Sequence, residues 1–127
     1  MAPGLGFLKE VVVDQHFTER GRISRLMAAV ALNPKILGLG IDEDTAVVFK
    51  SSSEFQVIGA GAVYVIDGME TTKSNILDSA EDEPLSVHNM KVHVLSSGES
   101  FSIEDRQPIV KGKYARKKVL TKISLHA

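Results

Sequence analysis

Residues 11–44 read VVVDQHFTERGRISRLMAAVALNPKILGLGIDED, and this stretch predicts a strand–helix–strand unit. Residues 11–13 form an unbroken β-branched run, which is typical of a strand buried on both faces of a parallel sheet. Beyond it, apolar residues recur at the spacing of one helix face, namely Ile23, Leu26, Met27, Val30 and Ala31. Asn33-Pro34 ends that helix. The short apolar run at 36–41 then predicts a second strand, parallel to the first.

Four further strands are expected downstream, at residues 45–49, 55–58, 62–66 and 87–95. Their short Ser- and Gly-containing links are typical of antiparallel hairpins. We therefore predict an α/β fold in which a partial, mostly parallel sheet with a flanking helix is combined with antiparallel hairpins.

The composition is that of one ordinary globular domain. The chain has 127 residues, of which 43% are hydrophobic and 24% charged. Its 15 basic and 16 acidic residues give a net charge of -1, so no global field favours nucleic acid or an anionic membrane as a partner. No apolar run approaches the roughly 20 residues of a membrane-spanning helix, and the first residues do not resemble a signal peptide. We expect a soluble, cytoplasmic protein.

The chain contains no cysteine, which excludes disulfides, thiolate nucleophiles and cysteine-ligated zinc. Its four histidines, at positions 16, 88, 93 and 126, do not have the spacing of zinc ligands, so we expect no metal and no cofactor. We predict one domain over residues 1–108 and a flexible basic tail over 109–127. Apart from Tyr114, no aromatic residue is interleaved with the basic residues of that tail, and no base-reading motif accompanies it.

Polar side chains follow both strands of the predicted parallel pair. The first group is Asp14-Gln15-His16 with Arg20, Arg22 and Arg25, and the second is Asp42-Glu43-Asp44. Ligands of open α/β sheets bind beyond the carboxyl ends of the parallel strands, so adjacent strands would bring His16 beside a carboxylate. A carboxylate that fixes the imidazole tautomer makes histidine a general base. Arg22 and Arg25, three apart on a helix, could bind carboxylates in a bidentate manner.

A serine nucleophile is missing from this arrangement. No Gly-x-Ser-x-Gly elbow occurs in the chain, and residues 96–100 lack the leading glycine and apolar strand that such a turn requires. Simpler interpretations also exist: His16, His88 and His93 as structural or surface histidines, the acidic triplet as a solvated turn, and the arginines as the polar face of a helix.

The sequence resembles the cyanophycinases at Asp14-Gln15-His16-Phe17, at Arg20-Gly21-Arg22, at Arg25-Leu26 and over residues 38–46. The resemblance begins near Gly4 and ends around Pro108. It implies the C-terminal half of a class I glutamine amidotransferase-like, or flavodoxin-like, fold. Cyanophycinases are intracellular serine exopeptidases, related to the aspartyl dipeptidases, that degrade multi-arginyl-polyaspartate to β-aspartyl-arginine dipeptides.

The resemblance implies that His16 is the general base and Glu43 its orienting acid, with Asp42 and Asp44 structural. It also implies that Asp14, Gln15, Arg20, Arg22 and Arg25 line the substrate pocket. In the family the serine elbow precedes this region, so we expect the chain to be inactive unless an N-terminal half-chain supplies the serine. Cyanophycinases tend to be dimers, and a homodimer is expected on the same basis.

Two other interpretations remain open. The chain could be a non-catalytic module that binds peptides containing aspartate and arginine, with His16 and Glu43 as relics. It could also be a truncated gene fragment without an independent role.

Overall fold

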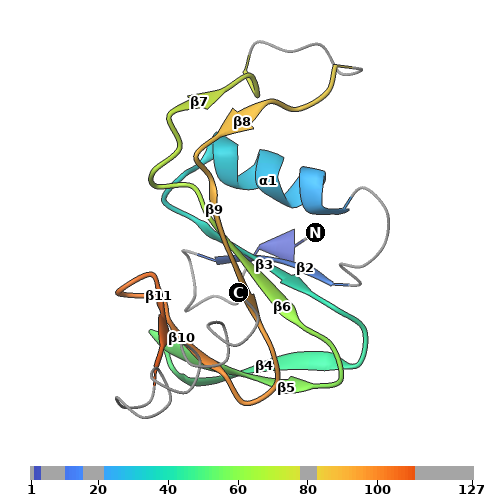
Figure 1. Ribbon diagram of the computed structural model, residues 1–127, viewed down its shortest axis with the longest axis vertical. Helices are drawn as coiled ribbons and strands as arrows, with labels where there is room; N and C mark the ends of the chain where they lie inside the picture. Colours follow the sequence, from blue (N-terminus) through green and yellow to red (C-terminus); the bar gives the residue numbers. More distant parts are fainter. Residues whose placement is uncertain (1, 4–10, 16–21, 78–82, 111–127) are drawn as a thin grey trace, which may run out of the picture.

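The computed structural model describes residues 2–3, 11–15, 22–77 and 83–110 (Figure 1). Its elements are, in chain order, β1 (Ala2–Pro3), β2 (Val11–Gln15), α1 (Arg22–Leu32), β3 (Leu37–Ile41), β4 (Thr45–Ser51), β5 (Glu54–Gly59), β6 (Val63–Asp67), β7 (Lys73–Ser74), β8 (Val87–His88), β9 (Lys91–Leu95), β10 (Ser100–Ser102) and β11 (Gln107–Ile109). Figure 1 shows α1 on one side of the β2–β3 pair and the strands β4, β5, β10 and β11 on the other. The predicted α/β fold with one flanking helix and antiparallel hairpins is confirmed.

The strands form a five-stranded sheet in the order β1-β2-β3-β6-β9, a four-stranded sheet in the order β11-β10-β5-β4, and the pair β7-β8. The prediction of a mostly parallel sheet is wrong. Among the described strands only β2 and β3 are parallel neighbours, and β1–β2, β3–β6 and β6–β9 are antiparallel. The reason is local: β3 leads by a short turn into the β4–β5 hairpin rather than into a crossover helix, so the chain returns antiparallel as β6.

The main core lies between the two larger sheets. Side chains alternate along β3, so Leu37, Leu39 and Ile41 all face the four-stranded sheet. They pack there with Phe55 and Phe101, whose stacked rings have centroids 5.6 Å apart. This core orients β3, and β3 in turn orients the site.

The other face of the five-stranded sheet is covered by α1. Leu26 and Val30 are fully buried there with Ile66. Helix and sheet approach so closely that a Cβ added at Gly38 would lie 2.8 Å from Cγ2 of Val30. The predicted apolar stripe is therefore confirmed at its centre, whereas its first member, Ile23, in the first turn of the helix, is 41% exposed.

The predicted strand at 87–95 is wrong in its continuity. Asn89, at a φ of 63°, separates β8 from β9, and these two strands belong to different sheets. Left-handed backbone of this kind interrupts a strand, and asparagine tolerates it better than most residues.

The predicted tail falls largely on residues 111–127, outside the described residues. Within the part of the chain that the structure describes, no helix has both the length and the apolarity needed to cross a membrane.

Candidate active site

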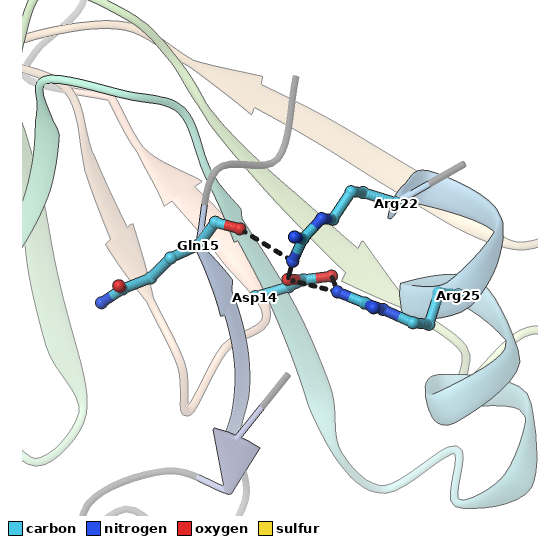
Figure 2. Close-up of polar contacts among 4 residues, drawn as sticks. All are labelled: Asp14, Gln15, Arg22 and Arg25. Carbon is cyan, nitrogen blue, oxygen red and sulfur yellow. Dashed lines mark hydrogen bonds and ion pairs between the residues drawn. The ribbon is translucent and has the colours of Figure 1, made fainter. Parts of the chain in front are cut away.

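A buried carboxylate at the end of β2 holds two arginines from the first turns of α1 (Figure 2). Nη1 of Arg22 lies 2.8 Å from Oδ1 of Asp14, and Nη2 of Arg25 lies 3.1 and 3.2 Å from the two carboxylate oxygens. Nη1 of Arg22 also donates to the backbone carbonyl of Gln15, at 3.3 Å. We call Asp14, Arg22 and Arg25 the Asp14 cluster.

Strand alternation and a glycine explain how the cluster forms. Asp14 is two residues from Val12, which packs on the α1 side of the sheet, so the carboxylate also faces α1. Its neighbour in the β3 register is Gly40, so no side chain of β3 competes for this space. The Asp14 side chain is fully buried, while those of Arg22 and Arg25 are 25% and 46% exposed. A buried carboxylate is tolerated only when it is paired, and here two guanidiniums pair with it.

The acidic turn, which we define as Asp42, Glu43 and Asp44, directly follows β3. In the parallel register Gln15 lies opposite Ile41, so the chain leaves β2 and β3 at the same edge of the sheet. Glu43 is exposed in this turn, and Asp42 is half-buried. The polar ends of the two strands are therefore neighbours, as the sequence predicted.

Comparison with known proteins shows which proteins this chain is similar to. No protein-family model matches it. The cyanophycinases of Trichormus variabilis and of a Nostoc species are each 48% identical to the chain over 106 residues, which is 84% of this chain and 36% of the relative. The cyanophycinase of Geminocystis herdmanii is 42% identical over 109 residues, covering 86% of this chain and 40% of that protein.

The matched part of the chain belongs to the cyanophycinase family. The resemblance seen in the sequence is thereby confirmed. The chain spans little more than a third of the length of these cyanophycinases.

The structure brings together three of the residues that the cyanophycinase resemblance implies for the pocket. Asp14, Arg22 and Arg25 contact one another, whereas Gln15 joins them through its backbone carbonyl and its side chain points away (Figure 2). Asp14 accepts hydrogen bonds from both arginines, and the role of these residues in a substrate pocket stays a prediction. His16 and Arg20 lie outside the described residues, so the pairing of His16 with Glu43 stays a prediction.

Sequence reasoning missed the hydrogen bonds that hold the acidic turn of this cyanophycinase relative. Thr45 donates through Oγ1 to the carbonyl of Glu43, at 2.9 Å, and the same oxygen accepts from the backbone N–H of Gly61, also at 2.9 Å. The two glycines at 59 and 61 were the available signal, since closely spaced glycines often mark a tight backbone approach.

A second missed group lies at the other end of the sheet. Arg106 donates through Nη1 to Oδ1 of Asp67, at 2.9 Å, and through Nη2 to the carbonyl of Lys35. Nearby, the ring of His93 packs on Phe101 with centroids 5.4 Å apart. Burial, with a smaller effect of Lys91, lowers the pKa of His93, against the opposing effect of Asp67. No local sequence pattern indicated these contacts.

Proposed function

We propose that the chain is the base-bearing part of a serine-type exopeptidase that hydrolyses cyanophycin to β-aspartyl-arginine dipeptides in the cytoplasm. The observation that carries this proposal is the parallel β2–β3 pair. His16 follows Gln15 directly, and Gln15 lies opposite Ile41, one residue before the acidic turn. The cyanophycinase relatives support the substrate and the reaction class. We also assign the complete domain to the class I glutamine amidotransferase-like fold.

In this proposal His16 is the general base and Glu43 its orienting acid. Glu43 accepts a hydrogen bond from one ring nitrogen, and the other nitrogen takes the proton of a serine hydroxyl as its oxygen attacks the scissile carbonyl. The imidazolium then gives this proton to the leaving amine, and water hydrolyses the resulting acyl-enzyme. The serine and the oxyanion-hole amides come from a partner, so the chain alone does not turn over substrate.

The contacts of the Asp14 cluster support binding of a substrate that carries carboxylates. Asp14 fixes the direction of two planar cations that each keep part of their surface in solvent. Planar guanidiniums bind carboxylates better than ammonium groups do. We propose that Arg22 and Arg25, together with Arg20 and Gln15, bind the carboxylates and backbone of the aspartyl chain, and that Asp14 is their anchor.

The edge of β2 is the proposed docking site of the N-terminal half-chain. Among the described residues its outer neighbour is the two-residue strand β1, which pairs with Val12 and Val13. Pro3 in β1 has no N–H to give to the pairing. A partner strand that replaced β1 would complete the hydrogen bonding of β2 and lie beside Asp14 and Gln15. Cyanophycinases tend to be dimers, and we keep a homodimer of the assembled enzyme as part of the proposal.

Complementation tests this function. The chain is mixed with the N-terminal portion of a cyanophycinase that contains the serine elbow and ends before the matched region, and release of β-aspartyl-arginine from cyanophycin is measured. We expect release from the mixture and not from either piece. We expect His16→Gln and Glu43→Gln to abolish or strongly reduce it, and Asp105→Asn, an exposed charge change, to leave it unchanged.

The same experiment distinguishes the enzyme part from the second candidate function, a non-catalytic peptide-binding module. An intact Asp14 cluster in a chain without a nucleophile also suits a module that binds aspartate- and arginine-containing peptides. Saturable binding of β-aspartyl-arginine by the chain, with no release from a stoichiometric mixture, would favour the module. If the chain neither binds the dipeptide nor restores its release, the interpretation as a truncated gene fragment would be favoured.

A further inference from the structure

We propose that Thr45 and Asp42 are positioning residues that clasp the acidic turn to the bend between β5 and β6, and so fix the backbone that carries Glu43. This inference rests on the proposed function. It extends that function by naming two residues, Thr45 and Asp42, that fix the backbone on either side of the proposed acid, Glu43.

The first side of the clasp is formed by Asp42. Oδ2 of Asp42 accepts a hydrogen bond from the backbone N–H of Ala62, at 3.0 Å, and the backbone N–H of Asp42 donates to the carbonyl of Ala62, at 3.2 Å. Oδ1 of Asp42 is buried, and no donor reaches it among the residues that the structure describes. An unpartnered buried carboxylate oxygen costs stability. Asp42 therefore suits a role in geometry better than a role in stability alone.

The second side of the clasp is the Thr45 hydroxyl, which joins both segments at once. It donates to the carbonyl of Glu43 and accepts from the N–H of Gly61, each at 2.9 Å. The carbonyl of Asp44 accepts from the N–H of Ala60, also at 2.9 Å. The backbone of Glu43 is thus fixed directly by a side chain, and the residue after it is fixed by the bend.

The bend has two glycines because the turn approaches it so closely. A Cβ at Gly61 would lie 2.7 Å from both Cβ of Asp42 and Oγ1 of Thr45. A Cβ at Gly59, whose φ is +119°, would lie 2.3 Å from the carbonyl oxygen of Asp44. Asp44 itself adopts a φ of 54°, so the turn is tight on its own side as well. A side chain added at Gly59 or Gly61 would therefore push the acidic turn away.

The titration of His16 in the chain alone tests this clasp without any partner. Its ring C–H signal is assigned by NMR with the His16→Gln variant, and the midpoint is followed through pH in charge-neutral variants. Because a neighbouring carboxylate stabilises the imidazolium, Glu43→Gln should lower the midpoint by about 1 pH unit. Thr45→Val should lower it by about half as much or more, since the carboxylate is retained but misdirected. Thr45→Ser, which keeps the hydroxyl, should behave as wild type.

A matched control is Thr72→Val, which removes a threonine hydroxyl that accepts a hydrogen bond from Asn89, away from the turn. It should leave the midpoint unchanged. Where Thr45→Val does not fold, Gly61→Ala addresses the same question from the other segment. A shift with Glu43→Gln but none with Thr45→Val or Gly61→Ala would overturn the clasp and keep the proposed function. No shift with Glu43→Gln would overturn the proposed pairing itself.

Discussion

Replacing Asp14 with asparagine should destabilise the fold, because Arg22 and Arg25 would lose the carboxylate charge with which they pair. Asp14 is fully buried and accepts hydrogen bonds from Arg22 and Arg25, with N–O distances of 2.8 to 3.2 Å. Removing one member of a fully buried ion pair typically costs about 3–5 kcal/mol. Arg22 and Arg25 remain 25% and 46% exposed and regain water when the charge is lost, so we expect about 2–3 kcal/mol, below that range.

Urea denaturation followed by circular dichroism measures this loss. Asp105→Asn is the matched control, because Asp105 is exposed and the substitution changes the same charge. We expect the control to alter the free energy of unfolding by less than about 0.5 kcal/mol. An Asp14→Asn variant as stable as this control, or more stable than wild type, would refute the account of Asp14 as the anchor of the arginines.

Three further predictions concern the packing of α1 at Gly38, the burial of His93 and the binding of substrate by Arg22. Gly38→Ala should cost about 1–3 kcal/mol of unfolding free energy, because its Cβ would clash with Val30 and Leu26; an unchanged denaturation midpoint would contradict the close packing of α1. Burial lowers the pKa of His93, so the unfolded chain binds a proton more readily, and stability should fall as pH drops below about 6.5. His93→Gln should flatten that dependence, and equal slopes of free energy against pH would exclude the assignment. In the complemented enzyme Arg22→Lys should lower kcat/KM at least about tenfold, whereas equal activity would argue against a guanidinium contact with substrate.

The local part of the fold could be predicted from the sequence. The β-branched run at 11–13 and the helical spacing of Leu26 and Val30 are both local signals, so the strand–helix–strand unit and the parallel direction of its two strands could be predicted. The position of Asp14 beside the arginines also followed, because a strand end and the next helix meet at one edge of the sheet.

The rest could not be predicted, because it depends on contacts between residues far apart in the chain. Nothing in the run at 36–41 indicates whether a strand returns beside it antiparallel, which is why the sheet was expected to be mostly parallel. Asn89 breaks the expected strand at 87–95 through a single left-handed residue. The hydrogen bond from Gly61 to Thr45 spans 16 positions and that from Arg106 to Asp67 spans 39, so neither has a local period.

The most direct measurement of the central claim is the reaction of a fluorophosphonate with the serine of the N-terminal partner. This reagent reports whether a base activates the hydroxyl, without requiring the substrate to bind. General-base catalysis contributes about 10²–10⁴-fold, so the partner's serine should be labelled at least about 100 times faster with the wild-type chain than with His16→Gln. Equal labelling rates with the two chains, in complexes of equal occupancy, would contradict the account.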